Sequence, residues 1–271
     1  MTFVVTGASG FLGRAVVEEL GRRKQPVIAA SRREAAFDAP AHALQIGDYA
    51  DIEPPDAHST LIHLAEPRDI AAAEAAGDAH IAATQQLLRA LVAHGWMHAI
   101  YVSSVAVHGE QQGGPRSVYG MAKAACEREV LARGGGVVRL TNVYGPGMAS
   151  NNVLADILSQ VPGSGPLRVR DAGPVRDYLW VADAARGIAD AAQQRLRGAI
   201  DLGTGKGVSV GELAHMVLVI ANEGGRPVVA TAPEGRPSEL IVDTAPAAER
   251  LGWKAVTGLE QGLAALMNRP Q

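Results

Sequence analysis

Hydrophobic residues follow two different periods along this chain, and the first twenty residues show both. Residues 2–6 form a short apolar run rich in β-branched side chains, which is typical of a buried strand. Residues 14–20 carry apolar side chains at helical spacing. The seven residues from 7 to 13 read Gly-Ala-Ser-Gly-Phe-Leu-Gly, so the chain opens with a strand, a glycine-rich turn and a helix.

The same alternation continues to about residue 145. It predicts strands at 27–30, 100–102 and 137–140, and helices at 79–94 and 119–131. Strands that alternate with helices favour a parallel, doubly wound α/β sheet. The pattern then loosens, and we expect a short strand at 168–170 and helices at 153–160, 182–194 and 210–222.

Three glycines in the opening turn indicate a dinucleotide site. Gly7 lets the turn close tightly, Gly10 lets the backbone approach a pyrophosphate, and Gly13 lets the helix lie close to the sheet. The free N–H groups at the start of the helix would face the phosphates. The spacing is G-x-x-G-x-x-G rather than G-x-G-x-x-G, and the alternative is a turn that binds nothing.

A second candidate site follows the strand at 100–102, which ends at Ser103 and Ser104. Tyr119 and Lys123 lie four residues apart, on one face of the next helix. A phenol holds its proton too tightly for transfer at neutral pH, and a nearby ammonium favours the phenolate. A serine hydroxyl can hold the substrate oxygen meanwhile. Ser104, Tyr119 and Lys123 are therefore a candidate catalytic set for hydride transfer between an alcohol or carbonyl and a nicotinamide.

Composition narrows the classes of partner. The 271 residues are 47% hydrophobic and 20% charged with a net charge of −3, which does not indicate a nucleic-acid partner. No apolar run reaches the roughly 20 residues that span a membrane, and we expect no signal peptide because a strand begins at once. The single cysteine, Cys126, fits a reducing cytoplasm and a buried position. His94 and His98 lack further ligands, so we expect no metal site.

Several further motifs follow in a fixed order. They are the end of a third strand at 61–65, a serine segment at 102–109, Arg-x-x-Asn-x-Tyr-Gly-Pro-Gly at 139–147, an Arg-Asp-aromatic segment at 175–183, and the segments 201–205 and 251–254. With the opening turn, they make residues 2–266 resemble the extended short-chain dehydrogenases/reductases of the nucleotide-sugar epimerase/dehydratase group.

This resemblance implies a division into domains and a set of cofactor residues. Residues 1–145 and about 175–205 would form a Rossmann-type NAD(P)-binding domain, and about 146–174 and 206–271 a small substrate-binding domain. The expected cofactor-binding residues are Gly7, Ser9, Gly10, Phe11, Leu12, Gly13, Ser31, Arg32, Arg33, Asp48, Leu64, Ala65, Tyr119 and Lys123.

The end of the second strand bears on the choice between NAD and NADP. A carboxylate there would bind the ribose 2′-OH of NAD, but the sequence reads Ser31-Arg32-Arg33. Two guanidiniums suit a 2′-phosphate, so we prefer NADP, with solvated loop charges as the alternative. Asp48 matches the family's acid that contacts the adenine, and its alternative is a turn residue.

The resemblance also implies contacts with a sugar nucleotide. Asn142 would contact it directly, and arginines of the substrate domain would hold its diphosphate, which suggests Arg236 and either Arg176 or Arg170. Each arginine can instead be a surface charge. Two acids, Asp177 and Asp183, are expected to tie a strand and a helix to the core by hydrogen bonds.

Departures from the family's patterns narrow the chemistry. Val105 and Ala106 stand where the 4,6-dehydratases carry acids, and apolar residues cannot act as acid and base, so we expect no dehydratase. The cysteine found past the serine in enzymes that both epimerise and reduce is missing. His108 and His80 replace a Tyr and an Asn, and we interpret both as packing substitutions.

We therefore predict an NAD(P)-dependent enzyme that transfers hydride at C4 of a nucleotide sugar, as a 4-keto reductase or a 4-epimerase. Arg32 and Arg33 favour the reductase, because exchangeable NADPH suits net reduction. The alternatives are a dehydrogenase of a free sugar or other small alcohol, and a dinucleotide-sensing protein without turnover. The resemblance also implies a homodimer, packed through the Tyr119 helix and its neighbour.

Overall fold

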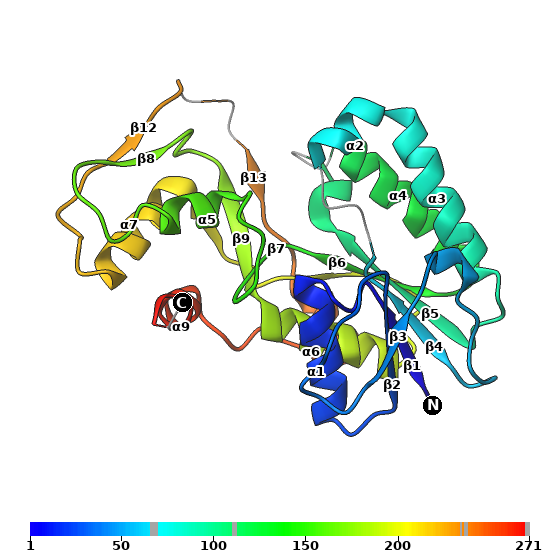
Figure 1. The fold of residues 1–271 in the computed structure, drawn as a ribbon. Helices are drawn as coiled ribbons and strands as arrows, with labels where there is room; N and C mark the ends of the chain where they lie inside the picture. Colours follow the sequence, from blue (N-terminus) through cyan, green and yellow to red (C-terminus); the bar gives the residue numbers. More distant parts are fainter. Residues whose placement is uncertain (66–69, 110–112, 234, 236–237, 269–271) are drawn as a thin grey trace.

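The computed structural model describes residues 1–65, 70–109, 113–233, 235 and 238–268, which form two lobes of unequal size (Figure 1). The larger lobe contains a seven-stranded sheet between helices. The smaller lobe contains short strands and helices from the second half of the chain. Within the described part of the chain, no helix combines the length and the apolar character that crossing a membrane requires.

Seven parallel strands make up the main sheet, in the order β10-β6-β5-β4-β1-β2-β3. The order reverses between β1 and β4, because β2 and β3 lie on one side of β1 and the later strands lie on the other. Ligands of such sheets bind at this reversal, beyond the carboxyl ends of the strands. The sheet confirms the predicted Rossmann-type doubly wound α/β fold. Its strands are β1 (Phe3–Thr6), β2 (Val27–Ser31), β3 (His42–Gln45), β4 (Thr60–His63), β5 (His98–Ser104), β6 (Gly136–Leu140) and β10 (Gly198–Leu202).

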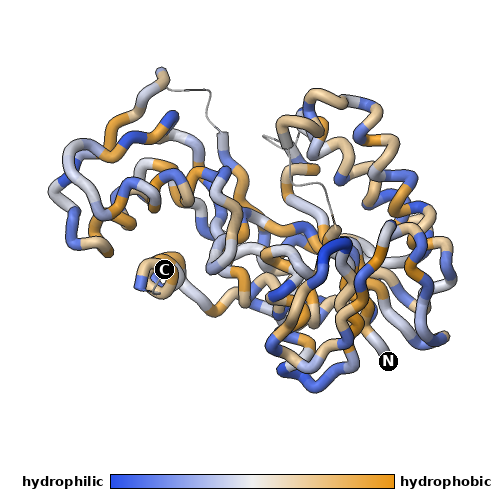
Figure 2. Tube along the Cα trace, in the orientation of Figure 1, coloured by the Kyte–Doolittle hydropathy of each residue, from blue (hydrophilic) through white to orange (hydrophobic). Residues whose placement is uncertain are grey.

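Helices cover both faces of this sheet and bury two hydrophobic layers. On one face, α1 (Phe11–Arg22) and α6 (Val181–Gln193) pack over a cluster that contains residues of β1, β5 and β6. On the other face, α3 (Asp78–Val92) and α4 (Val118–Leu131) cover a second cluster, in which Cys126 is fully buried as predicted. Figure 2 shows hydrophobic residues gathered along the strands between these helices.

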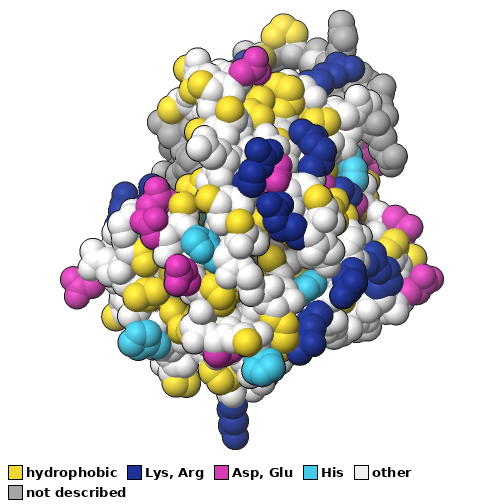
Figure 3. All heavy atoms as spheres, turned by 90° about the vertical axis from the view of Figure 1, so that its right-hand side faces the viewer, with side chains coloured by type: hydrophobic (Ala, Val, Ile, Leu, Met, Phe, Trp, Pro, Cys, Tyr) yellow, Lys and Arg dark blue, Asp and Glu magenta, His cyan; other side chains and the backbone are white. Residues whose placement is uncertain are grey.

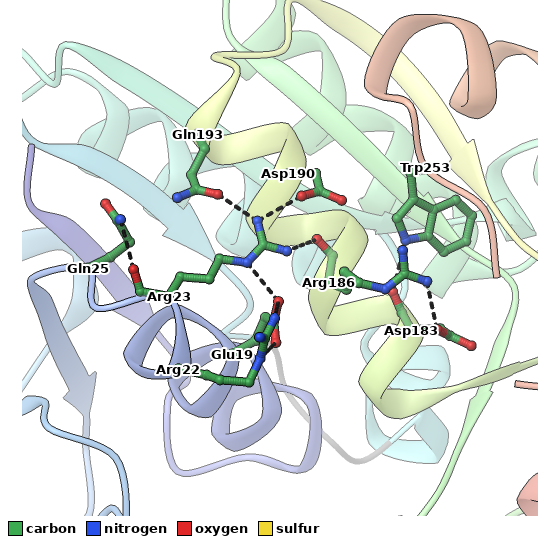
Figure 4. Close-up of polar contacts among 9 residues, drawn as sticks. All are labelled: Glu19, Arg22, Arg23, Gln25, Asp183, Arg186, Asp190, Gln193 and Trp253. Atoms are coloured by element: carbon green, nitrogen blue, oxygen red, sulfur yellow. Dashed lines mark hydrogen bonds and ion pairs between the residues drawn. The ribbon is translucent and has the colours of Figure 1, made fainter. Parts of the chain in front are cut away.

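A guanidinium just after α1 joins that helix to α6 (Figure 4). Arg23 donates to the carboxylates of Glu19 and Asp190, each at 2.7 Å. It also donates to the carbonyl of Arg186 at 3.2 Å and to the side-chain oxygen of Gln193. These four contacts fix two helices that are far apart in the sequence on the same face of the sheet.

Part of the carboxyl-terminal region returns to the larger lobe. Helix α8 (Ala245–Leu251) contacts β10 and α6, and Trp253 is 1% exposed in the same cluster as the residues of α1 and α6. A side chain at Gly187 of α6 would meet the indole of Trp253 at 2.9 Å. The predicted division assigns 206–271 to the substrate domain. It therefore separates α8 and Trp253 from the core of the larger lobe, in which they pack.

The smaller lobe is built around strand β9, which pairs with β7, β11 and β13, although the predicted division assigns it to the cofactor domain. A separate pair, β8 and β12, lies further out. The elements of the smaller lobe are β7 (Asn142–Tyr144), β8 (Leu167–Val169), β9 (Val175–Trp180), β11 (Gly207–Ser209), β12 (Val228–Ala230), β13 (Glu239–Leu240), α5 (Val153–Leu158), α7 (Val210–Ile220) and α9 (Leu259–Met267).

Several elements of the larger lobe, among them β3, α2, β10 and α8, have no counterpart among the predicted strands and helices. Strand β3 lies at the sheet edge and exposes His42, Ala43 and Gln45, so it lacks an apolar run. Helix α2 (Ile70–Ala76) is almost all alanine and lacks an amphipathic pattern. Because β3 precedes it, the segment 61–65 ends the fourth strand, β4, and not the third as expected.

Candidate active site

The glycine-rich turn after β1 lies at the point where the strand order reverses. Gly7 has φ +69°, and a side chain there would lie 2.8 Å from the backbone nitrogen of Ala65, which follows Leu64 after β4. A side chain at Gly13 would overlap the carbonyl oxygen of Gly7. Only glycine therefore lets the turns after β1 and β4 meet while α1 lies against β1.

The start of α1 offers unpaired backbone donors to an anion. Gly10 is the N-cap, with φ −76° and ψ 169°, and no side chain caps the helix there. The half-buried residues Ser9, Phe11 and Leu12 flank it. An α-helix leaves its first N–H groups without partners, and these groups with the helix dipole favour a phosphate. The turn therefore fits the pyrophosphate of a dinucleotide.

The residues after β2 present two cations. The hydroxyl of Ser31 is buried and donates to the carbonyl of Arg33, which closes the turn. Arg32 and Arg33 are exposed, and the Arg32 guanidinium lies 5.5 Å from the ring centre of Tyr49. Asp48 caps the 3-10 helix η1 (Tyr49–Asp51). It therefore has the role of a turn residue, which the sequence analysis gave as the alternative to an adenine contact. Contacts of these residues with a cofactor stay predictions.

A neutral histidine ends β4 beneath this edge of the sheet. His63 is 2% exposed, and its Nδ1 lies 2.8 Å from the Oγ1 of Thr6. Its ring stacks on Tyr101 at 6.1 Å and meets Tyr49 edge-on at 6.2 Å. Burial, and then the positive charge of Lys123, lower the pKa of His63 to about 3. His63 therefore adds no charge to the site at neutral pH.

The structure brings Tyr119 and Lys123 together next to β5. Lys123 is only 6% exposed, and its Nζ donates to the carbonyl of Val102 at 2.8 Å, two residues before Ser104. The same Nζ lies 5.7 Å from the ring centre of Tyr119, which is half-buried. The ammonium is thus fixed between the strand that ends at Ser104 and the phenol ring.

Close packing holds the start of α4 against the turn after Ser104. The Oγ of Ser104 accepts the N–H of Ala106 at 3.2 Å and caps the 3-10 helix η2 (Val105–Val107). A side chain at Gly120 would lie 3.0 Å from the carbonyl oxygen of Ala106. The residue after Tyr119 therefore has to be small, and the segments that carry Ser104 and Tyr119 touch each other.

Two of the predicted substrate residues, Asn142 and Arg176, lie in the smaller lobe. Asn142 is exposed at the start of β7. Arg176 donates to the carbonyls of Val175 at 2.8 Å and Ser238 at 3.0 Å, and to the hydroxyl of Ser238 at 2.8 Å, so it joins β9 to the segment before β13. Arg236 lies outside the described residues. Substrate contacts of these three residues stay predictions.

Two buried carboxylates have the structural role that the sequence predicts. Asp177 is fully buried and accepts the N–H groups of Thr204 and Gly205, both at 2.9 Å, which ties β9 to the turn after β10. Asp183 is 2% exposed and accepts the N–H of Thr257 at 2.8 Å and the guanidinium of Arg186 at 2.7 Å. Both carboxylates are thus occupied by the protein itself.

Sequence reasoning missed several polar residues at this edge. Glu127 follows Lys123 by four residues on the same face of α4, and this spacing is a usable signal. Arg139 and Asp201 are neighbours only because β6 pairs with β10. His108, interpreted as a packing substitution, instead has its Nε2 2.8 Å from Asp201.

Comparison with known proteins places the chain in a family. Residues 3–203 match the model of the NAD dependent epimerase/dehydratase family. The chain belongs to this family. Its glycine-rich turn and its Tyr119–Lys123 pair both lie within the matched region.

Among curated members of the family, the chain is 25% identical to the dTDP-L-rhamnose 4-epimerase of Burkholderia thailandensis, over 97% of this chain and 93% of that protein. It is 23% identical to a UDP-glucose 4-epimerase of Vibrio cholerae over 55% of this chain. That match covers 54% of the Vibrio protein, so the similarity spans about half its length. Both relatives are named for inversion at C4.

Among solved structures, MoeE5 in complex with UDP-glucose and NAD superposes with a TM-score of 0.81 and 27% identity, over 98% of this chain and 97% of that one. The UDP-glucose 4-epimerase of Thermotoga maritima superposes with the same TM-score at 24% identity. Both comparisons support the Rossmann-like architecture of the larger lobe.

Proposed function

We propose that this protein inverts the configuration of a nucleotide sugar at C4, with a nicotinamide dinucleotide bound at the carboxyl edge of the main sheet. One observation carries the proposal. The Lys123 ammonium is fixed by the Val102 carbonyl at 2.8 Å and lies 5.7 Å from the ring centre of Tyr119, next to the strand that ends at Ser104. This is the arrangement that proton transfer coupled to hydride transfer requires.

The glycine cradle supports the placement of the dinucleotide. Side chains at Gly7 or Gly13 would collide with backbone, and the start of α1 has no capping side chain, so its N–H groups can face the pyrophosphate. A dinucleotide held there by the glycine turn would supply the hydride chemistry at C4. The residues of the protein would then transfer the proton and orient the sugar.

Three side chains divide this work. As the phenolate, whose oxygen carries a negative charge, Tyr119 would take the proton of the C4 hydroxyl, and as the neutral phenol it would give that proton back. The fixed ammonium of Lys123 stabilises that charge and can also hold the nicotinamide ribose. Ser104, capped into its turn by the N–H of Ala106, would orient the substrate oxygen. Asn142 and the predicted arginines Arg176 and Arg236 would contact the rest of the sugar nucleotide.

The turn after Ser104 argues against elimination of water. Val105 and Ala106 occupy the positions at which an acid and a base would be needed, and neither has a titratable side chain. The names of the curated relatives agree with inversion, since both are 4-epimerases. We therefore propose C4 epimerisation rather than dehydration.

The test is to incubate the protein with NAD and, separately, UDP-glucose and dTDP-L-rhamnose, and to identify C4 epimers by NMR. We expect inversion of at least one sugar, and Tyr119→Phe should lower kcat about 100- to 10,000-fold while NAD still binds. Cofactor binding without any response to nucleotide sugars would contradict the proposal. Turnover of a free sugar would then favour a dehydrogenase, and no turnover at all a dinucleotide sensor.

A second candidate is a 4-keto reductase that uses NADPH, and the exposed Arg32 and Arg33 after β2 favour it. The end of β2 carries Ser31 in place of an acid, so nothing at that residue repels a 2′-phosphate. If these arginines bind the phosphate, replacing both with Ser should weaken NADP about tenfold or more and leave NAD unchanged. Arg22→Ala, at another exposed arginine, is the matched control. Equal losses for both cofactors would rule out 2′-phosphate recognition.

We also propose that two copies pair through α3 and α4. The outer side of α3 exposes Ala79, Ala82, Ala83 and Ala90, whose small side chains would let a second helix approach closely. Figure 3 shows the side of the larger lobe on which α3 lies, where hydrophobic, basic and acidic side chains are mixed. Pairing there would leave the carboxyl edge of the main sheet open to ligands.

A further inference from the structure

A continuous chain of polar side chains runs from α4 across two strands of the main sheet. The hydroxyl of Ser103 donates to Glu127 at 2.6 Å, and Glu127 accepts two parallel hydrogen bonds from Arg139, at 2.9 and 2.6 Å. The same guanidinium lies 3.6 Å from one oxygen of Asp201. The other oxygen of Asp201 lies 2.8 Å from the Nε2 of His108. We call these five residues the Glu127–His108 network.

The network is largely withdrawn from water. The side chains of Glu127, Arg139 and Asp201 are 6%, 21% and 22% exposed, and that of His108 is 31% exposed. Glu127 raises the pKa of Arg139, chiefly through its hydrogen bonds, so the guanidinium stays charged. The bidentate Glu127–Arg139 pair has a fixed geometry, and the guanidinium is connected to Asp201 by an ion pair at 3.6 Å.

His108 holds the loop between Ser104 and Tyr119 from two sides. Its imidazole reaches Asp201 on β10, and its carbonyl accepts the N–H of Gly114 at 2.9 Å. Gly109 has φ +65°, and a side chain there would overlap the carbonyl oxygen of Gly114. His108 and Gly109 therefore touch Gly114 within this loop, and the imidazole attaches this part of the loop to the main sheet.

Each element that carries a proposed catalytic side chain is attached to this network. Ser103 is the neighbour of Ser104 on β5. Glu127 follows Tyr119 by eight residues and Lys123 by four, on one face of α4. The loop that leads from Ser104 to Tyr119 is attached through His108. The network thus connects β5, this loop and α4.

We infer that His108 is a positioning residue for the proposed C4 chemistry: through Asp201 it fixes the loop that sets the Ser104 hydroxyl against the Tyr119 phenol. This inference rests on the proposed function. His108 acts through Asp201 and the backbone of its loop, and the reacting atoms are left to Ser104 and Tyr119. Removing its imidazole leaves Asp201 without one partner and leaves the loop unattached at that point.

The test compares His108→Leu, which cannot bond Asp201, with His108→Gln, whose amide can. We expect kcat for the inverted sugar to fall about ten- to hundredfold in His108→Leu with little change in KM or Tm, because catalysis depends steeply on orientation. His108→Gln should recover most of the rate. His215→Leu, at an exposed histidine of α7, is the matched control and should behave as wild type.

Hydrogen–deuterium exchange separates this inference from the proposed function, because it needs no turnover. His108→Leu should raise exchange in residues 105–120 and leave the rest of the main sheet unchanged, and His108→Gln should not. If the wild type turns over no sugar and His108→Leu still raises exchange only in this loop, the result contradicts the proposed function but not the positioning role. Wild-type exchange and rate in His108→Leu, or a loss of Tm with faster exchange throughout the sheet, would overturn the positioning role.

Discussion

At the scale of single residues, burial has opposite consequences for two basic side chains beneath the site. Lys123 is buried but has a carbonyl partner at 2.8 Å and lies 4.9 Å from the ring centre of Tyr101, so its ammonium is solvated by the protein. His63 is buried beside that ammonium, and its pKa is lowered to about 3. The site therefore keeps one defined positive charge, next to Tyr119.

His63 gives a stability prediction with a definite sign. Its pKa is lower in the folded chain than the ordinary value near 6.5, so the unfolded chain binds a proton that the folded chain does not. Its contribution is present above pH 6.5 and is lost as the pH falls toward 3. Between pH 7 and pH 5, urea denaturation should show wild type losing about 2 kcal/mol more than His63→Gln. The same loss in both proteins would contradict the neutral, buried histidine.

The proposed catalytic residues could be identified from the sequence, but the side chains that hold them in place could not. Ser104, Tyr119 and Lys123 are close together in the sequence, and a helix face predicts the last two as neighbours. Asp201 lies 93 residues from His108, and Arg139 meets Asp201 because β6 pairs with β10 and meets Glu127 because α4 packs on β6. Local patterns hold no signal for contacts that depend on strand order.

At the scale of elements, α1 and α6 are joined by hydrogen bonds as well as by apolar packing. Arg23 connects Glu19 on α1 with Asp190 and Gln193 on α6, and its side chain is only 17% exposed (Figure 4). Its neighbour Arg22 is 68% exposed and bonds only Glu19 among the residues drawn. The two arginines therefore form a matched pair for testing what attaches α1 to α6.

Arg23→Ala should destabilise the protein by about 2 kcal/mol, because it leaves the partly buried carboxylate of Asp190 without its cation and removes the link between α1 and α6. Arg22→Ala should cause little change, because surface pairs contribute little. Chemical denaturation of both variants measures the difference. Equal effects would mean that apolar packing alone attaches α1 to α6.

The exposure of an element determines whether the sequence predicts it. Helices α1, α6 and α7 bury one mostly apolar stripe, so their apolar periodicity is clear in the sequence. Strand β3 exposes three of its four residues, and α2 is an alanine run, so neither has a pattern to read. The return of α8 to the main core rests on Trp253 and on the space at Gly187, which no local period reveals.

At the scale of the molecule, the larger lobe would bind the dinucleotide and carries Ser104, Tyr119 and Lys123. The smaller lobe would bind the sugar nucleotide. The proposed pairing of two copies through α3 leads to a prediction of mass. Light scattering should give twice the 28.2 kDa of the chain. Ala83→Arg should give a monomer, because a buried charge without a partner opposes association. The control Ala245→Arg, at an exposed alanine of α8, should stay dimeric. A monomeric wild type would contradict the pairing.

The central claim is that hydride leaves C4 of the sugar and returns to it while Tyr119 carries the proton. The most direct test follows deuterium placed at C4 of a sugar nucleotide that the protein inverts, beginning with UDP-glucose in the presence of NAD. We expect an epimer that keeps its deuterium at C4, and no such product from Tyr119→Phe. Inversion with the deuterium lost to water, or equal turnover by Tyr119→Phe, would contradict it.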